Sequence, residues 1–432
     1  MQNRKSRYYK QTPPGGASTP STPIDNLNNK RAEAKRQFMK KQRLRQRERR
    51  QAARQQSKSS NKHTLMLIIA AKKVKRERWS TIAAETLDIV LGDGKYVEER
   101  RVPLLSSTLA QSARQGSFDV FTTTTHVAHD VAAQIELSRQ GTIFYPHYSE
   151  PLAKWAHAHP ITSTTTTIDF SRNSTLTVAR RLSQSLPPSG PQTKLGVLSF
   201  ASPKKPGGGF LHGGDEQEET IARLSSLVAS LGVPAAKDFY KEHKKYKVED
   251  GSGLHDHSMV CSPGVVVIRR DWDDDTEGRP SEDSTGGDFI APYLINVLSV
   301  VPVNAAAVRA KHLILPSEEQ FFEDGIRSAM KERMARALRV FEERGDKVLV
   351  LGAFGCGSSQ NKVEMVASVW AELLVCGRSE DGGEEAAKRA ARFKNSFEKV
   401  VFAVPGKLFE LFKSAFEMRI FEEQVALATM DE

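Results

Sequence analysis

Hydrophobic and polar residues follow two different periods along the chain from about residue 70 onward. Apolar residues recur at helical spacing in RERWSTIAAETLDIVLGDG (76–94), and glycine ends the pattern. Two threonine-rich pieces, FTTTTHVAHDV (121–131) and ITSTTTTIDF (161–170), favour strands because β-branched side chains fit a pleated surface. The next stretch, SRNSTLTVARRLSQSL (171–186), again predicts an amphipathic helix.

Strand, glycine-rich loop and helix then follow one another twice. The first unit is KLGVLSFASP (194–203), the loop PGGGFLHGG and EQEETIARLSSLVASL (216–231), which we expect to be one helix with an acidic first turn. The second unit follows a helix over 325–345 and consists of KVLVLGAF (347–354), the loop GAFGCGSSQN (352–361) and a helix over 362–377. This alternation predicts a layered α/β fold with ligand loops at the carboxyl ends of central strands.

Two polar, glycine-rich segments interrupt the alternation. They are RDWDDDTEGRPSEDSTGG (270–287) and RSEDGGEE (378–385). We expect both to be surface insertions, because acidic and glycine-rich stretches are usually exposed.

The first 62 residues differ in composition from the rest. They contain 18 Lys and Arg against 3 Asp and Glu, a surplus of 15. Since the whole chain carries +11, residues 63–432 carry about −4. Residues 1–62 have too few apolar side chains to offset the entropy of ordering. We therefore expect a disordered basic tail, with helix formation on binding left open, and a folded part over 63–432.

The tail suggests a location inside the cell. Clustered Lys and Arg suit nuclear import or contact with nucleic-acid phosphates, although a solvated charge run fits equally well. Arginine-rich starts also occur in mitochondrial transit peptides, which we consider a weaker interpretation. No apolar run approaches the roughly 20 residues that cross a bilayer. We expect a nuclear or cytoplasmic protein without membrane contact.

The cysteines predict neither disulfides nor a metal site. Cys261, Cys356 and Cys376 are an odd number and lack CxxC or Cys/His spacing. A reducing compartment fits this usage. We expect no metal.

The two glycine loops have the chemistry of an anion site. Backbone N–H groups at a helix amino end attract anions, and two such loops can hold a diphosphate between them. Neither loop contains the Gly-Lys-Ser/Thr of a P-loop, and no good GxGxxG fingerprint is present. The first loop ends in Gln217, Glu218 and Glu219, which places two carboxylates where acid and base catalysis on a glycosidic bond can occur. On the pattern alone, a flexible turn into an acidic helix start is the simpler interpretation.

The spacing of this loop nevertheless resembles a known signature. GGG (207–209), seven residues and QEE (217–219) is similar to the GGG, six to eight residues, QEE of poly(ADP-ribose) glycohydrolases. Further blocks resemble the microbial-type branch of that family in the same order, from about residue 73 to 375. They are RERWSTIAAETLDIVLGDGKYV, VLSFASPKKPGGGFLHGGDEQEETIARLSSLVASL, HSMVCSPGVVVIRRD, APYLINVLSVVPVN and VLVLGAFGCGSSQN.

The resemblance implies a macrodomain, a mixed sheet between helices that binds ADP-ribose, preceded here by extra amino-terminal helical and strand segments. It implies hydrolysis of ribose–ribose bonds in poly(ADP-ribose), with release of ADP-ribose and without a cofactor. Glu219 would protonate the leaving oxygen and then activate water, Glu218 would bind the ribose hydroxyls, and Gln217 would orient the pair. The other implied substrate contacts, largely through main-chain groups, are Gly207, Gly208, Gly209, Gly352, Ala353, Phe354, Gly355, Cys356, Gly357, Ser358 and Asn361.

The protonation state of Glu219 is left open by the sequence. A helix amino terminus stabilises a carboxylate, whereas a general acid needs its proton. Glu218 and a substrate diphosphate, both negative, would act in the opposite direction.

The chain departs from the family pattern in the second loop. Where microbial relatives have GCG, one residue, then Phe-Gly-Asn, this chain has Ser359 and Gln360 before a retained Asn361. Val363 replaces a common Pro. Loss of the Phe removes aromatic area that lies against the nucleotide, so we expect weaker affinity or altered chain-length preference.

Two further departures and several other residues have simpler interpretations. Lys205 replaces a common Asn, and either meets a phosphate or faces water; Cys261 replaces a common Tyr. We expect His255 and His257 in a surface loop, Cys356 to contribute its N–H and not its sulfur, and Trp370 to lie in the core. His147, His157 and His159 receive no role.

Two other functions stay open at this point. The departures at Ser359 and Gln360 fit a macrodomain that binds ADP-ribose but turns it over poorly. Alternatively, the basic tail is the working part of a nucleic-acid-associated protein. The partners expected are poly(ADP-ribose) or ADP-ribosylated proteins, and nucleic acid through the tail.

Overall fold

The computed structural model describes residues 39–41, 65–103, 122–157, 165–186, 193–249, 253–274, 286–311, 314–376 and 391–430. The chain divides into two compact units, Met1–Lys72 and Lys73–Glu432. Residues 39–41 and 65–91 are helical. The rest of the predicted tail, its disorder and the predicted boundary at residue 62 lie outside the described residues. No helix in the described part of the chain has the length and apolarity needed to span a membrane.

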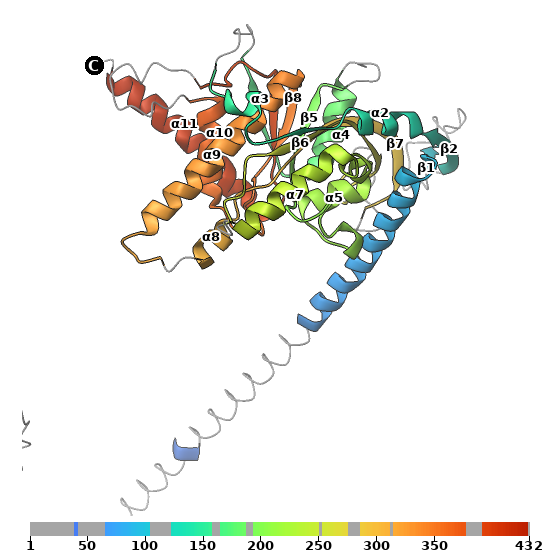
Figure 1. Ribbon diagram of the computed structural model, residues 1–432. Helices are drawn as coiled ribbons and strands as arrows, with labels where there is room; N and C mark the ends of the chain where they lie inside the picture. Colours follow the sequence, from blue (N-terminus) through green and yellow to red (C-terminus); the bar gives the residue numbers. More distant parts are fainter. Residues whose placement is uncertain are drawn as a thin grey trace, which may run out of the picture. The chain divides into compact units, whose positions relative to one another are not determined.

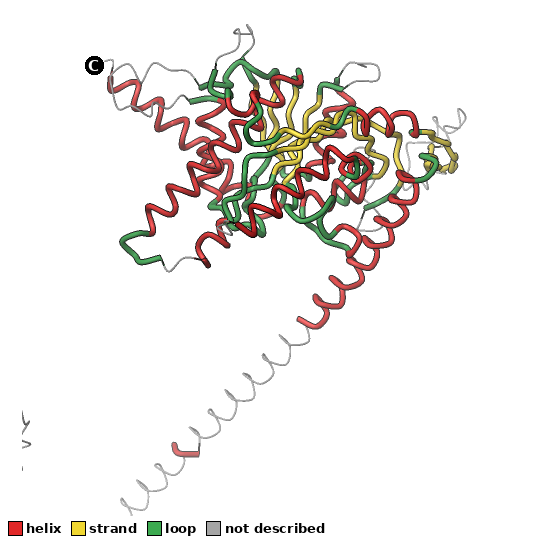
Figure 2. Tube along the Cα trace, viewed as in Figure 1, coloured by secondary structure: helices red, strands yellow, loops and turns green. Residues whose placement is uncertain are grey.

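The second unit is built on a mixed sheet (Figures 1 and 2). Seven strands of the described residues pair in the order β3-β6-β7-β5-β8-β9-β4. Strands β7, β5, β8, β9 and β4 run parallel to one another, whereas β3 and β6 are antiparallel to their neighbours. The bounds are β3 Ile143–Tyr145, β4 Thr167–Ser171, β5 Leu195–Phe200, β6 Met259–Arg269, β7 Phe289–Val300, β8 Val348–Leu351 and β9 Lys399–Ala403.

Both faces of this sheet are buried. Successive residues of β8 belong to different clusters, with Val350 in one and Leu351 in the other, because side chains alternate along a strand. Helices α8, α9, α10 and α11 pack on the Leu351 face, and α4, α5, α6 and α7 on the Val350 face (Figure 1). Their bounds are α4 Thr175–Ser185, α5 Gln217–Leu224, α6 Leu227–Leu231, α7 Pro234–Glu249, α8 Ala305–Lys311, α9 Glu319–Arg344, α10 Val363–Leu374 and α11 Phe409–Met430. The predicted sheet between helices is confirmed.

The amino-terminal extension adds a two-stranded sheet. Strand β1 (Lys95–Pro103) pairs with β2 (Thr122–Asp130) in antiparallel register, and α2 (Ala132–Gln140) follows. Tyr96 and Ile135 of this extension pack with Ile268 of β6, which joins it to the main sheet. A short helix, α3 (Glu150–Ala153), follows β3.

Several predicted elements differ in extent; for example, the helix predicted over 325–345 begins at Glu319. The helix predicted over 216–231 is divided at Ser225, whose hydroxyl donates to the Ile221 carbonyl and whose backbone forms a bridge with Val267. α5 and α6 are therefore separate. Of the strand predicted over 161–170, residues 161–164 lie outside the described ranges and the strand begins at Thr167. The predicted insertion 378–385 also lies outside them.

Candidate active site

The two glycine loops open into one cavity. β5 and β8 are adjacent parallel strands, with Leu195 opposite Val348, so the loops that follow them leave the same edge of the sheet. The cavity has a volume of about 660 Å³ and includes Gly208 and Gly209 from the first loop and Gly355 and Gly357 from the second. The loops approach each other at Glu216, near Gly357. Segments after β7, β9 and β4 also contribute, at Pro302, Val404 and Ser174 respectively.

Glu219 is held at the cavity wall by backbone N–H groups. Its Oε1 accepts from Gly209 N–H at 2.6 Å, and its Oε2 accepts from Glu216 N–H at 3.0 Å, which completes a capping box at the start of α5. Added Cβ atoms at Gly208, Gly209 and Gly214 would all crowd its carboxylate. The glycines therefore make room for the acid. Their predicted contact with ribose and phosphates stays a prediction.

Glu218 is buried in the cavity wall, with 2% of its surface exposed. Its Oε2 accepts from Ser202 N–H at 2.7 Å, whereas Oε1 has no hydrogen-bond partner among the described residues. Burial raises the pKa of Glu218 to about 8, the Glu219 carboxylate adds to this, and the N–H groups of Ser202 and Gly207 oppose it. Burial therefore favours the protonated form of Glu218 at neutral pH.

Gln217 ties the start of α5 to the end of β5. Its Oε1 accepts from Phe200 N–H at 2.8 Å, and its Nε2 donates to the Leu198 carbonyl at 2.8 Å and to the Thr175 hydroxyl at 3.1 Å. These bonds use both the oxygen and the nitrogen of the amide and fix the start of α5, whereas the predicted role of Gln217 in orienting the glutamate pair stays a prediction.

Arg223 lies below the glutamates, one turn along α5. It is 1% exposed, donates to the Gly214 carbonyl at 2.8 Å and stacks on the Trp79 ring at 4.5 Å. Burial lowers the pKa of Arg223 to about 10, opposed by the charges of Asp271, Glu219 and Asp215. Even so it stays charged at neutral pH and supplies positive charge beneath the site.

Only part of the second loop faces the cavity. Ala353, Gly355, Gly357, Ser358 and Ser359 line it. Gly352, Phe354, Cys356, Asn361 and, in the first loop, Gly207 are predicted contacts that do not appear in its lining.

Some backbone N–H groups of the second loop donate hydrogen bonds within the loop, and others do not. Those of Phe354 and Cys356 donate to Gly352 and Ala353 carbonyls within the loop. Within the described residues, the N–H groups of Gly355, Gly357 and Ser358 donate no hydrogen bond. These three, together with those of Ala353 and Ser359, which also donate no hydrogen bond within the described residues, are available to an anion.

Three residues of the second loop support it from below. Phe354 is fully buried against Phe200, with ring centres 5.3 Å apart. Asn361 donates to the Val303 and Gly355 carbonyls at 2.7 and 3.0 Å. Burial raises the pKa of Cys356 to about 12, with the Glu364 charge adding to it, so its thiol is not an activated nucleophile.

The structure also shows where three other residues named in the sequence analysis lie. Trp370 is fully buried, as predicted, and donates to the Gly352 carbonyl at 3.1 Å. Cys261 lies in the core, whereas Lys205 lines the cavity.

Val363, His147 and His157 do not line the cavity. Val363 begins α10. His147 and His157 are exposed, and His159 lies outside the described residues. No group of three or more His, Cys, Asp or Glu in the described ranges is arranged to hold a metal ion.

Two predictions about loops are wrong. The segment starting at 270 is not simply a surface insertion, because Asp271 and Asp274 are buried and Asp271 and Trp272 line the cavity. His255 also lines the cavity, and His257 is half-buried, with a pKa lowered to about 2 by burial and then by Arg333, Arg336 and His147.

The sequence signals for these residues were weak. Asp271 and Trp272 directly follow a buried strand, in the position where site residues often occur, but their acidic surroundings favoured exposure.

Comparison with known proteins now identifies the family. The family model of the microbial-type PARG catalytic domain, where PARG is poly(ADP-ribose) glycohydrolase, matches residues 106–270. The crystal structure of PARG from Thermomonospora curvata bound to the inhibitor ADP-HPD is 30% identical, covers 79% of this chain and 99% of its own, and superposes with a TM-score of 0.54.

A second solved structure agrees. PARG from Deinococcus radiodurans in complex with ADP-ribose is 29% identical, covers 66% of this chain and 96% of its own, and has a TM-score of 0.51. No curated protein gives a significant match. Together with the glutamate pair and the two loops around one cavity, these likenesses show that the chain belongs to the microbial-type poly(ADP-ribose) glycohydrolase family.

Proposed function

We propose that the chain hydrolyses the ribose–ribose O-glycosidic bonds of poly(ADP-ribose) and releases ADP-ribose. The observation that carries this proposal is that Glu218, Glu219 and both glycine loops line one cavity of about 660 Å³. A diphosphate in the second loop would meet the N–H groups of Gly355, Gly357 and Ser358. The adjoining sugar linkage would then lie toward the first loop and its carboxyl groups.

Glu219 acts as acid and then as base. In the first step its proton goes to the oxygen of the leaving ribose as the glycosidic C–O bond breaks, and an oxocarbenium-like centre forms. In the second step the Glu219 carboxylate removes a proton from water, whose oxygen bonds to that centre. The two N–H groups that bind Glu219 stabilise the anion that exists between these steps.

Glu218 holds the sugar. Its protonated carboxyl faces the cavity with Oε1 unpartnered among the described residues, so it can hydrogen-bond a ribose hydroxyl. A neutral buried carboxylic acid donates such a bond without adding a second negative charge beside Glu219.

Release of ADP-ribose from the polymer by the full chain tests this proposal. Glu219→Gln should lower the release rate by about 10³-fold, because general acid–base catalysis contributes about 10²–10⁴-fold. The variant should still bind ADP-ribose in calorimetry. Glu150→Gln is the matched control, since Glu150 is exposed on α3 and does not line the cavity. A wild-type protein that binds ADP-ribose but releases none from polymer would replace this proposal with a binding function.

That binding function is the second candidate. It is favoured by Ser359, which lines the cavity where the family pattern has Phe, and by Gln360 where it has Gly. A reader of ADP-ribose would show binding by wild type and by Glu219→Gln alike, with no release by either. The same pair of measurements therefore separates the two candidates.

We further propose that the basic tail contacts a polyanion, either nucleic acid or poly(ADP-ribose) itself, and directs the protein to the nucleus, where ADP-ribose removal would serve the DNA damage response. The surplus of 15 positive charges over residues 1–62 supports this proposal. Removal of residues 1–62 should lower affinity for both polyanions and reduce the salt dependence of binding. Unchanged salt dependence, or unchanged location of a fluorescent fusion in cells, would contradict it.

A further inference from the structure

Two lysines supply the positive charge that lines the cavity. Among the described residues in its lining, Lys204 and Lys205 are the only Lys or Arg residues. Five carboxyl groups line the same cavity, those of Asp215, Glu216, Glu218, Glu219 and Asp271. Poly(ADP-ribose) carries a negative diphosphate in every unit, so a cavity rich in carboxyl groups repels it unless cations offset them.

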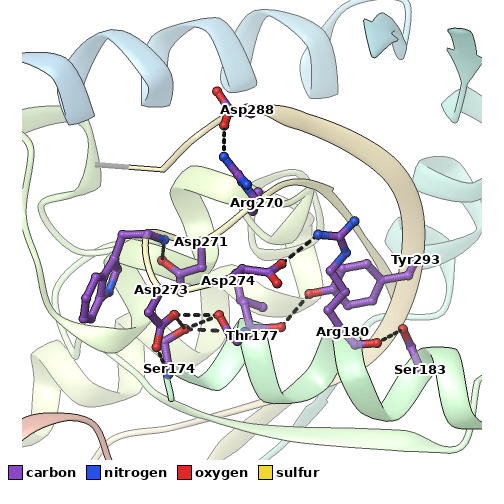
Figure 3. A network of polar contacts seen from close by, with 12 residues as sticks. Ser174, Thr177, Arg180, Ser183, Arg270, Asp271, Asp273, Asp274, Asp288 and Tyr293 are labelled. Carbon is purple, nitrogen blue, oxygen red and sulfur yellow. Dashed lines mark hydrogen bonds and ion pairs between the residues drawn. The ribbon is translucent and has the colours of Figure 1, made fainter. Parts of the chain in front are cut away.

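The arginines near the cavity are engaged within the fold (Figure 3). Arg180 is buried and forms an ion pair with Asp274 at 2.8 Å, and Arg270 pairs with Asp288. Arg223 lies beneath the glutamates and is 1% exposed. None of these arginines appears in the cavity lining. The two lysines are therefore the cations that a ligand in the cavity meets.

Both lysines lie on the first loop, close to the glutamates. Lys205 comes directly before the glycine turn, and its carbonyl accepts from Gly208 N–H at 3.1 Å. The N–H of Lys204 donates to the Ser202 hydroxyl at 3.3 Å, and Ser202 N–H in turn binds Glu218. The backbone of the two lysines is thus fixed beside the carboxyl groups that act on the sugar linkage.

The ammonium groups of the lysines are available to a ligand. Both side chains are exposed, and neither forms an ion pair with another described residue. A lysine has a long flexible stem and an ammonium that donates to phosphate oxygens. The diphosphate of the unit that is released has the N–H groups of the second loop as its donors. The lysines of the first loop are left for a different phosphate.

The chemistry of the polymer supplies that phosphate. The leaving oxygen, which Glu219 protonates, is the 2′ oxygen of an adenosine ribose in the next unit. The same ribose carries the diphosphate of its own unit on the 5′ oxygen. A second diphosphate is therefore tethered to the leaving group, on the side of the cavity where the glutamates and the lysines lie. Free ADP-ribose has no second diphosphate.

We propose that Lys204 and Lys205 form a binding site for the diphosphate of the leaving unit, the ADP-ribosyl unit on the other side of the bond that is cut. The inference rests on the proposed function, because that bond defines where the leaving unit lies. It adds a preference: the protein binds chains of two or more units more tightly than one unit. A single ADP-ribosyl group on a protein lacks the second diphosphate and gains nothing from the lysines.

Two ligands of defined length test this site. ADP-ribose and its dimer, two units joined by a ribose–ribose bond, are titrated by calorimetry into the full chain carrying Glu219→Gln, which leaves the dimer uncut. We expect the dimer to bind about tenfold tighter, a gain that two exposed charge pairs can give. Lys204→Gln together with Lys205→Gln, added to this protein, should abolish the difference and leave the affinity for ADP-ribose unchanged.

A matched control removes the same charge elsewhere. Lys244→Gln together with Lys245→Gln changes two exposed lysines of α7 that do not line the cavity, and should preserve the preference for the dimer. Lys204→Arg together with Lys205→Arg should also preserve it, because the charge is retained. Thermal unfolding of each variant checks that it is folded.

The salt dependence of binding gives a second readout. The affinity for the dimer should fall as salt concentration rises, because binding to phosphates releases counterions. Lys204→Gln together with Lys205→Gln should reduce the slope of log affinity against log salt concentration by about 1.4, the value for two neutralised phosphate charges on a single strand. The α7 control should leave the slope unchanged.

The outcomes separate this inference from the proposed function. An equal loss of affinity for both ligands in the Lys204 and Lys205 variant would show that the lysines contact the released unit, which overturns the inference. It is also overturned if the dimer binds no tighter than ADP-ribose, or if the α7 control loses the preference. Release of ADP-ribose from polymer by wild type tests the proposed function by itself, and a wild type that binds both ligands but releases none fails only that test. If neither ligand binds, both fail.

Discussion

The Glu219 carboxylate occupies the space that a side chain on Gly214 would need. An ideal Cβ built on Gly214 would overlap both carboxylate oxygens of Glu219. Gly214 does not have a left-handed φ, so the backbone itself would accept alanine. The glycine is therefore required at this position by the proximity of the acid.

Gly214→Ala should displace Glu219 without removing it. We expect the release rate to fall about 10²-fold, because a shift of about 1 Å in a reacting group costs that much. ADP-ribose affinity should change little, since Gly214 does not line the cavity. Gly325→Ala on α9, where nothing lies within 4 Å of an added Cβ, should retain full activity. Equal rates for the two variants would show that the position of Glu219 is not critical.

Glu218 should make stability depend on pH. Its pKa is raised from 4.5 to about 8, so between these values the folded chain binds more protons than the unfolded chain. Folding stability is thus lost as pH rises through this window, by up to roughly 5 kcal/mol. Glu218→Gln removes the group. The difference between the melting temperature of Glu218→Gln and that of wild type should increase from pH 4.5 to pH 8, because wild type alone loses this contribution to stability. A difference that does not change with pH would mean that Glu218 is ionised throughout.

Ser359→Phe should restore aromatic contact in the second loop. Ser359 lines the cavity, and an aromatic contact contributes about 0.5–1.5 kcal/mol, so ADP-ribose should bind about 2–10-fold tighter. Ser359→Ala serves as the control for loss of the hydroxyl and should bind as wild type does. Weaker binding by the Phe variant alone would show that the cavity has no room for the ring.

Gln360 has φ +53, a left-handed conformation that glycine adopts without the usual cost. Gln360→Gly should therefore leave stability unchanged or raise it by up to about 1 kcal/mol. Gln320→Gly, in the first turn of α9, should lower stability by up to about 1 kcal/mol. Chemical denaturation measures both. Equal destabilisation by the two substitutions would contradict a strained backbone at Gln360.

The sequence predicted the elements whose signals are local. Strand β5 and its glycine loop are read from a short apolar run followed by GGG, and the Glu219 position follows from its spacing to that run. The division at Ser225 could not be read in this way, because it depends on a bridge to Val267, a residue of a distant strand.

Long-range contacts also explain why some residues of the site were predicted wrongly. Asp274 is buried because Arg180 of α4 pairs with it, and the acidic stretch alone gives no sign of that partner. His255 reaches the cavity because β6 runs antiparallel to β7, which brings its start to the edge where the loops lie. Local composition predicted that these segments are exposed. Contacts with residues far away in the sequence bury them or bring them to the cavity instead.

The adjacency of β5 and β8 has a practical consequence for engineering. The two glycine loops start about one strand spacing apart, about 4.8 Å, because they follow neighbouring strands. The connection from β5 to β8 carries Glu218, Glu219 and strands β6 and β7, so a reporter sequence inserted there would leave catalysis intact only outside these elements.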